Sequence, residues 1–205
     1  MPEAIQLLRT IEDLKKTEVK DLVSARVREF ESEKTDEGLF SELCFCILTA
    51  NFDAERSIKI QEEIGKNFLT LTEPELASEL KQLGHRFPNT RAKYIVGARR
   101  HTLRKIIDSF EGEELRDWLA KNVKGIGYKE ASHFLRNIGF KNLAILDFHI
   151  IDVLVRNGLI QKPKLTREKY MEIEELLRYI AAEVNLNLAE LDLYLWFAET
   201  GKVLK

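Results

Sequence analysis

The stretch VKGIGYKEA, residues 123–131, decides the fold of this chain. Two glycines flank one apolar residue, and a lysine follows two positions later, at the start of a segment with amphipathic helical spacing. Gly125 and Gly127 can adopt backbone angles that a Cβ atom would forbid, so they permit a tight connection between two helices. The pattern predicts a helix-hairpin-helix over residues 112–138.

Such a hairpin leaves backbone N–H groups bare near a helix N-terminus, where an anion binds favourably. It grips a phosphate backbone without reading the bases, so Gly125 and Gly127 are predicted contacts to a DNA backbone. A plain turn between two helices, capped by glycines, is the alternative interpretation, because G-x-G alone is a weak signal.

A second candidate residue lies eighteen positions beyond Lys129. Asp147 precedes the apolar-periodic segment FHIIDVLVRNG and stands in an N-cap position. The helix that begins near Lys129 is on the order of 15 Å long, and the seven residues 140–146 can span roughly 23 Å. The chain can therefore return and place Lys129 and Asp147 across one cleft. Asp147 as a simple helix cap is the alternative.

The run VKGIGYKEASHFLRNIGF, together with D-F-H at residues 147–149, resembles the helix-hairpin-helix DNA glycosylase superfamily. That superfamily includes endonuclease III and the 8-oxoguanine glycosylases, and its pattern is L-P-G-V-G-x-K-x-A followed by V-D-x-H. This chain differs at Lys124, where proline is usual, and at Leu146, where valine is usual. Phe148 fills the variable position. None of these differences removes a chemical group.

Composition and periodicity favour an all-α protein. The chain has four prolines and ten glycines, is 44% hydrophobic, and repeats i, i+3, i+4 apolar spacing in FSELCFCILTA and YMEIEELLRYIAAEV. Helices are expected near residues 3–15, 18–32, 37–50, 53–68, 73–82, 89–108, 112–121, 127–138, 147–157, 166–184 and 187–199. Thr72, Thr166 and Asn187 are expected helix starts.

The resemblance implies that residues 1–205 form one glycosylase unit of two helical lobes around a DNA-binding groove. The lobe that carries the hairpin is expected near residues 50–145. Residues 1–49 and 146–205 are expected to form the second lobe.

The resemblance also implies the chemistry. An enzyme of this kind flips a damaged nucleotide out of the duplex. Lys129 would attack C1′ as a neutral amine, release the base and form a Schiff base with the opened sugar. Asp147 would stabilise positive charge on the sugar and orient or deprotonate the lysine. Members with this lysine are bifunctional and cleave the strand by β-elimination, whereas an isolated surface lysine is normally inert.

Three residues resemble those that contact the opened duplex. Asn51, in CILTANFDAERS, is similar to the residue that fills the vacated base position, although it could instead cap the helix that starts near Asp53. The segment LGHRFPNTRAKYIVGA resembles one in 8-oxoguanine glycosylases. Arg91 would face the opposite cytosine or its backbone. Phe87 would be the wedge between bases, with a core anchor as its alternative.

The segment LDLYLWFAETGKVLK resembles the closing segment of compact archaeal-type 8-oxoguanine glycosylases, in which the terminal residue helps to build the base pocket. Trp196 or Phe197 is therefore expected to stack on the extruded base, and Lys205 to contact it. An aromatic pair at this spacing is otherwise typical of a core. His149 is expected to support the local fold rather than to transfer a proton.

No cofactor is expected. Cys44 and Cys46 lie two apart on an apolar helix, which suits neither a disulfide nor a zinc site. A four-iron cluster needs four thiolates, and the chain has only two cysteines. The superfamily's hairpins hold a monovalent ion on DNA. The resemblance thus implies a Na⁺ or K⁺ site at the backbone carbonyls of Lys121, Val123 and Ile126.

Charge distribution favours DNA despite a net charge of −2. Residues 80–107 contain no acidic side chain and eight basic ones, which predicts a phosphate-binding face. The eight are Lys81, Arg86, Arg91, Lys93, Arg99, Arg100, Arg104 and Lys105. A solvated helix surface that happens to lack acids is the alternative.

No apolar run approaches the roughly 18 residues of a membrane span, and residues 1–10 lack the order of a signal peptide. A soluble, cytoplasmic monomer that binds double-stranded DNA is expected. The predicted function is excision of 8-oxoguanine with strand cleavage. Two alternatives stay open: the same chemistry on an oxidised pyrimidine, and a non-catalytic helix-hairpin-helix module that only binds DNA.

Overall fold

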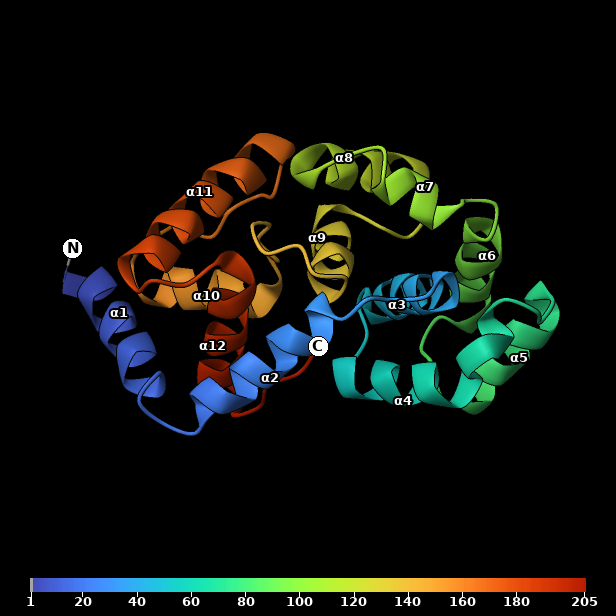
Figure 1. Cartoon of the computed structure of the whole chain (residues 1–205), viewed down its shortest axis with the longest axis horizontal. Helices are drawn as coiled ribbons and strands as arrows, with labels where there is room; N and C mark the ends of the chain where they lie inside the picture. The colour runs from blue at the N-terminus through green and yellow to red at the C-terminus, as the bar shows by residue number, and fades with distance from the viewer. Residues whose placement is uncertain (1) are drawn as a thin grey trace. The chain divides into compact units, whose positions relative to one another are not determined.

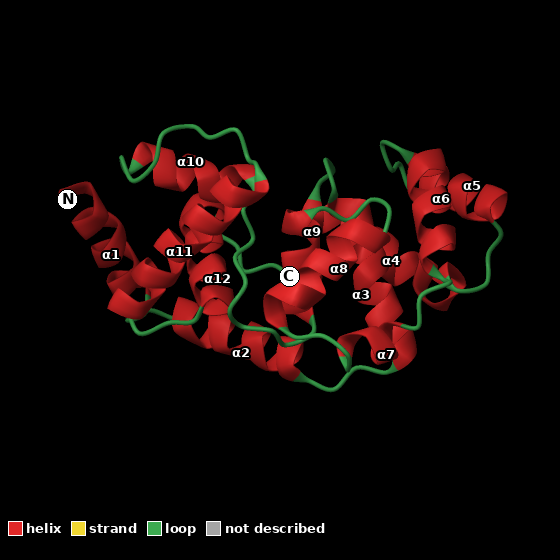
Figure 2. Cartoon of the chain, turned by 90° about the horizontal axis from the view of Figure 1, so that it is seen from above, coloured by secondary structure: helices red, strands yellow, loops and turns green. Residues whose placement is uncertain are grey.

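The computed structural model describes residues 2–205 and contains only helices and connecting loops in that range (Figure 1, Figure 2). The predicted all-α fold class is confirmed. The helices are α1 (Pro2–Leu14), α2 (Val19–Glu31), α3 (Asp36–Thr49), α4 (Ala54–Ile64), the 3₁₀ turn η1 (Gly65–Phe68), α5 (Glu73–Gln82), α6 (Pro88–Ala98), α7 (Leu103–Ile107), α8 (Gly112–Asn122), α9 (Tyr128–Asn137), α10 (Phe148–Arg156), α11 (Arg167–Glu183) and α12 (Leu188–Thr200).

Polar N-caps start the helices where the sequence predicted them. The side chains of Thr72, Thr166 and Asn187 each accept a hydrogen bond from a backbone N–H of the first turn. Thr72 and Asn187 also form capping boxes with the glutamate three residues later. These bonds satisfy N–H groups that have no partner within the helix. All three predicted starts are confirmed.

Two predicted helices are interrupted. In the segment 53–68, the α-helix α4 stops before Gly65, which adopts a positive φ of 49°. The rest of the segment forms the 3₁₀ turn η1. The segment 89–108 is split into α6 and α7 by a turn in which the His101 N–H donates to the Ala98 carbonyl (3.0 Å). Arg99 Nε donates to the Phe68 carbonyl (2.8 Å) and ties this turn to the end of η1.

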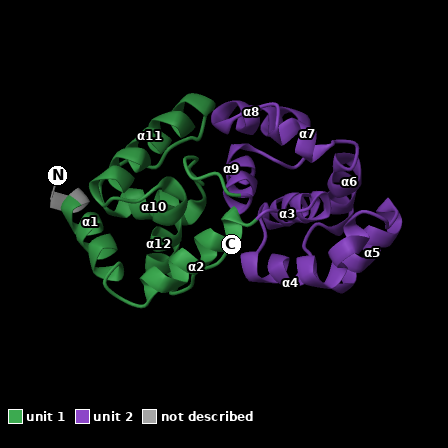
Figure 3. Ribbon diagram, viewed as in Figure 1, with its two compact units in different colours: residues 1–32, 139–205 green, residues 33–138 purple. Residues whose placement is uncertain are grey.

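The chain divides into two compact units (Figure 3). Unit 1 contains the residues up to Ser32 and Gly139–Lys205, and unit 2 contains Glu33–Ile138. The predicted boundary near residue 49 is therefore wrong. Helix α3 belongs with the hairpin unit, because it packs against α4, α6, α7 and α9.

Helix α3 is the core of unit 2. Its residues 43–48, LCFCIL, have no exposed surface, which explains why apolar residues occur on every side of this helix. An all-round apolar helix is stable only when neighbours cover all its faces. Cys44 and Cys46 are free thiols in this run, and burial raises the pKa of the Cys44 thiol.

Helix α12 has the corresponding role in unit 1. It packs against α1, α2, α10 and α11, and Leu191, Leu193, Tyr194 and Leu195 are buried along it. Asn187 caps the start of the helix with its side chain, and Gly201 ends it in the left-handed conformation. Helix α10 thus packs against the buried central helix of its unit.

Within residues 2–205, no helix combines the length and the apolar character needed to cross a membrane. The same residues contain no group of three or more His, Cys, Asp or Glu side chains arranged to hold a metal ion.

Candidate active site

The predicted helix-hairpin-helix is formed by α8, a loop at residues 123–127, and α9, all within unit 2. Gly125 adopts a φ of 88°, a region that L side chains rarely occupy. A Cβ atom there would lie 2.5 Å from Cδ2 of Tyr94. Both the backbone angle and the close approach of the Tyr94 ring therefore require glycine at this position.

We expect Gly125→Ala to destabilise the hairpin by about 1–2 kcal/mol from the backbone alone, with a further cost from displacing Tyr94. Thermal or urea unfolding measures the loss, and the affinity for duplex DNA falls with it. Gly97→Ala on α6 is the matched control, because nothing lies within 4 Å of an added Cβ there. Equal unfolding free energies for the two variants would refute this explanation of Gly125.

Gly127 is the N-cap of α9, and its N–H donates to Oε2 of Glu130 (3.2 Å). This is half of a capping box, since glycine has no side chain to return the bond. The carboxylate of Glu130 stands at the helix N-terminus, where the helix dipole favours negative charge. In the free protein, Glu130 thus occupies one N–H of the predicted phosphate grip.

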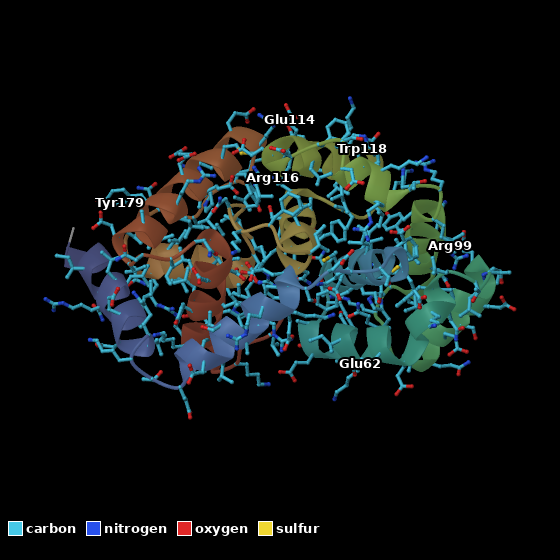
Figure 4. All side chains as sticks on the ribbon, viewed as in Figure 1. Glu62, Arg99, Glu114, Arg116, Trp118 and Tyr179 are labelled. Carbon is cyan, nitrogen blue, oxygen red and sulfur yellow. The ribbon has the colours of Figure 1, made fainter. Side chains whose placement is uncertain are left out.

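Buried polar contacts lock α9 onto α8. The Tyr128 hydroxyl donates to Oδ1 of Asp117 (2.7 Å). Arg116, labelled in Figure 4, is fully buried on α8, lies over the Tyr128 ring and approaches Oγ of Ser132 (3.4 Å). These contacts fix the first turn of α9, which carries Lys129.

Lys129 is the second residue of α9, and its side chain is 25% exposed. Its Nζ lies 3.9 Å from Oε1 of Glu130. The same carboxylate therefore contacts both the candidate nucleophile and the Gly127 N–H. Lys129 is thus a partly buried amine on a braced helix turn, not a freely solvated surface lysine.

Asp147 lies in unit 1 as the N-cap of α10, and its Oδ1 accepts a hydrogen bond from the Ile150 N–H (2.9 Å). The predicted cap is confirmed. The cap uses one carboxylate oxygen and leaves the second for chemistry. Capping and catalysis are therefore compatible functions of this residue.

Aromatic rings lie directly after Asp147. The Phe148 side chain is exposed, and its ring stacks on His149 with centroids 3.8 Å apart. His149 meets the Trp196 ring edge-on at 4.6 Å. His149 thus joins α10 to α12, which fits its predicted role in supporting the local fold.

The predicted base-pocket residues all lie in unit 1. Trp196, Phe197 and Lys205 are each partly buried. Nε1 of Trp196 is buried and has no acceptor within residues 2–205. A buried indole N–H without an acceptor is costly, so this donor marks Trp196 as the stronger of the two aromatic candidates. The pocket assignment itself stays a prediction.

Asn51 occupies an exposed turn after α3, with a φ of 58°. It does not cap α4, since the Asp53 side chain accepts the hydrogen bond from the Arg56 N–H (2.8 Å). That alternative for Asn51 is wrong. Asparagine tolerates the left-handed conformation better than most residues, which fits its place in this turn, and its contact to DNA stays a prediction.

Arg91 does not face outward. Its side chain is buried and donates to the Ala50 carbonyl. Burial lowers the pKa of its guanidinium, and nearby Tyr94 and Glu130 oppose that effect. In the free protein Arg91 therefore holds the turn that presents Asn51, and its contact to the opposite cytosine or its backbone stays a prediction.

His85 joins the end of α3 to the start of α6. Its Nε2 donates to the Leu48 carbonyl (3.1 Å), and its Nδ1 accepts from the Phe87 N–H (3.0 Å). Only the neutral ring can donate at one nitrogen and accept at the other. The ring also stacks on Phe52, with centroids 4.2 Å apart.

The buried His85 gives stability a defined pH dependence. Burial, the largest cause, and the charges of Arg91 and Arg56 lower its pKa. The unfolded chain therefore binds its proton more readily, and the stabilising contribution is present above about pH 6.5 and lost as the pH falls. We expect the difference in unfolding temperature between wild type and His85→Gln to shrink between pH 7.5 and pH 5. A constant difference would contradict this account.

Phe87 precedes α6 and is half-buried. The guanidinium groups of Arg86 and Arg91 lie 5.0 and 5.6 Å from its ring centroid. This contact with two cations differs from a core anchor, whose ring would be enclosed by apolar groups. The wedge function of Phe87 stays a prediction.

The basic stretch is not a uniform phosphate-binding face. Arg91, Arg99 and Arg104 donate to backbone carbonyls within unit 2, and Arg104 also pairs with Asp36 (3.1 Å). These three charges stabilise the fold. The remaining basic side chains, which are exposed, are Lys81, Arg86, Lys93, Arg100 and Lys105.

The carbonyls of Lys121, Val123 and Ile126 stay the predicted ligands of a monovalent ion. The Val123 carbonyl accepts one hydrogen bond, from the Ile126 N–H (3.2 Å). A carbonyl oxygen has a second lone pair, so this bond is compatible with an ion at the same group.

Sequence reasoning missed Tyr94, Glu130 and His85. The Tyr94 ring packs against Gly125, a residue distant in the sequence, and no local sequence pattern predicts such a contact. His85 likewise contacts Leu48, 37 residues away. Glu130 carried a readable signal, because glutamate at the third helical position is typical of a capping box.

The sequence is similar to those of known DNA repair enzymes. A family described as 8-oxoguanine DNA glycosylase matches residues 23–186. A Methanocaldococcus jannaschii protein named 8-oxoguanine DNA glycosylase/AP lyase is 56% identical, covering 98% of this chain and 100% of its own. A protein of the same name from Korarchaeum cryptofilum is 54% identical, covering 97% and 98%.

Solved structures agree as well. The crystal structure of the M. jannaschii enzyme in complex with 15mer DNA containing 8-oxoguanine has a TM-score of 0.95 at 55% identity, covering 98% of this chain and 100% of that one. The 8-oxoguanine DNA glycosylase of Thermotoga maritima has a TM-score of 0.94 at 44% identity, covering 98% and 100%. The chain therefore belongs to the 8-oxoguanine DNA glycosylase family.

Proposed function

We propose that this protein excises 8-oxoguanine from double-stranded DNA and then cleaves the strand at the abasic site. The observation that carries the proposal is the match over 98% of the chain to a relative named for both activities. The crystal structure of that relative with lesion-containing DNA supports the substrate class.

Lys129 is the proposed nucleophile. Its uncharged amine attacks C1′ of the extruded nucleotide, the N-glycosidic bond breaks, and the base leaves with the bonding electrons and takes a proton. Ring opening of the sugar gives a Schiff base with Nζ. Loss of a C2′ proton then expels the 3′ phosphate by β-elimination. The hydrogen bond of the adjacent Tyr128 to Asp117 supports this role, because it fixes the backbone turn that carries Lys129.

Asp147 is the proposed electrostatic partner. Its carboxylate stabilises positive charge that develops on the sugar as the base departs. The cap bond to Ile150 holds the side chain in one orientation. This preorganisation favours the transition state, since the carboxylate does not have to be reoriented during the reaction.

The hairpin is the proposed backbone grip. A phosphate that reaches the Gly127 N–H competes with Glu130 for the same donor. We expect the Glu130 carboxylate to turn away from this N–H when DNA binds. Gly125 keeps the loop in the conformation of the grip, because its positive φ and the nearby Tyr94 ring leave no room for a side chain.

The remaining contacts are proposed from the family resemblance and from burial. Trp196, rather than Phe197, stacks on the extruded base, with its buried N–H as a donor to the base, and Lys205 contacts the same ligand. Asn51 fills the vacated position, and Phe87 separates the bases. The protein is proposed to work as a monomer without an iron–sulfur cluster or catalytic metal.

A lesion panel tests the substrate. Duplexes with 8-oxoguanine opposite each base, an oxidised pyrimidine, or no damage are incubated with the enzyme in excess and in the presence of EDTA. We expect excision and nicking only at 8-oxoguanine. Faster reaction at the oxidised pyrimidine would replace this proposal by the alternative substrate, and binding without cleavage would indicate the non-catalytic module.

A further inference from the structure

The connector at residues 142–146 leads directly into Asp147, and its side chains at 143–146 are buried. Buried backbone N–H and C=O groups need hydrogen-bond partners. The connector has no helix or sheet to supply them. Its partners are instead side chains of α11, a neighbouring helix of the same unit.

Two buried residues of α11 make three of these bonds. Glu174, 1% exposed, accepts from the Ala144 N–H through Oε2 (2.7 Å). The Tyr170 hydroxyl donates to the Ala144 carbonyl (2.7 Å) and accepts from the Leu146 N–H (3.3 Å). The Tyr170 hydroxyl therefore both donates a hydrogen bond to and accepts one from the residues that precede Asp147.

A third residue of α11 adds a fourth contact, because Nη2 of Arg178 donates to the Asn142 carbonyl (3.5 Å). Residues 170, 174 and 178 are four apart and share one helix face, and they meet connector residues 146, 144 and 142, which are two apart. Four helical residues rise about 6 Å, and two extended residues advance about 6.6 Å. The two rows therefore stay in register along the whole connector.

We propose that Tyr170 and Glu174 are positioning residues that clamp the connector and so fix the place of Asp147. The Leu146 N–H is held on one side of Asp147, and the cap bond to Ile150 holds the other. Hydrogen bonds thus hold the chain on both sides of Asp147, at the preceding residue and in the first turn of α10. This inference rests on the proposed function only for the catalytic role of Asp147.

Tyr170→Phe removes the hydroxyl and keeps the ring. We expect it to slow single-turnover excision of 8-oxoguanine by about 10- to 100-fold, the cost of a small misplacement of a reacting group, with the Kd for lesion DNA within twofold of wild type. Tyr194→Phe is the matched control, because Tyr194 is a buried tyrosine of the same unit on α12. We expect it to excise at the wild-type rate.

A double-mutant cycle separates positioning from general destabilisation. In an Asp147→Asn background, Tyr170→Phe should cause no further slowing, because its effect acts through the carboxylate. Equal slowing in both backgrounds would overturn the proposal, as would a Tyr170→Phe enzyme with the wild-type rate. Glu174 gives a second series: Glu174→Gln keeps an acceptor for Ala144 and should stay within threefold of wild type, whereas Glu174→Leu should be slowed like Tyr170→Phe.

Amide hydrogen exchange tests the clamp without substrate. Exchange at Leu146 should be faster in Tyr170→Phe than in wild type and in Tyr194→Phe. A wild-type protein that does not excise 8-oxoguanine would count against the proposed function alone. Unchanged exchange at Leu146 would overturn the clamp itself, whatever the activity.

Discussion

Lys129→Gln is expected to abolish the covalent intermediate and to lower the rate of 8-oxoguanine excision by on the order of 10³-fold or more. Glutamine has a similar length but an amide nitrogen that does not attack C1′ or form an imine. The rate is measured under single-turnover conditions with the enzyme in excess. Because the ion pair with Glu130 is partly exposed, its loss should change the free energy of unfolding by less than about 1 kcal/mol.

Lys59→Gln on α4 is the matched control, since Lys59 is an exposed helical lysine outside the candidate site. It should cleave and form the intermediate like wild type. If Lys129→Gln retained the intermediate, the nucleophile would be another amine, and the hairpin would serve only to bind DNA.

Asp147→Asn is expected to slow excision by about 100- to 1,000-fold, the usual cost of removing one electrostatic stabiliser of a transition state. The fold should be retained, because asparagine caps helices about as well as aspartate. The comparison with Asp147→Ala separates the two functions of the residue. Both variants lose the charge, but only alanine loses the cap, at about 0.5–2 kcal/mol of stability.

Single-turnover excision and urea unfolding of the two variants are therefore measured together. Similar rates with different stabilities would support separate catalytic and capping roles. An Asp147→Asn enzyme that excises at the wild-type rate would limit Asp147 to its cap, which is the structural alternative raised by the sequence.

Local signals explain why the helices and the hairpin were predictable. N-caps such as Thr72, Thr166 and Asp147 act within one helical turn, and Gly125 marks a backbone angle that few other residues adopt. The placement of α3 was not predictable in this way. Besides the adjacent α4, its apolar faces pack against α6, α7 and α9 from more distant parts of the chain, so periodicity shows that it is buried but not in which unit.

In the candidate site, too, residues with local signals could be predicted and residues that act through long-range contacts could not. Lys129 and Asp147 could be found because a lysine after the hairpin and an aspartate before a helix are local patterns. Arg91 was assigned to DNA because its segment resembles one in 8-oxoguanine glycosylases, yet in the free protein its guanidinium donates to the Ala50 carbonyl. A charged side chain in a basic stretch is not necessarily solvated, and only the long-range contact reveals its role. The partners Tyr170 and Glu174 were invisible for the same reason.

The most direct test of the central claim is borohydride trapping with wild-type protein on a duplex that has 8-oxoguanine opposite cytosine. Reduction converts the imine to a stable amine, and peptide mapping identifies the attached residue. The account predicts a covalent protein–DNA adduct at Lys129. No adduct from wild type, or an adduct at any other lysine, would contradict it.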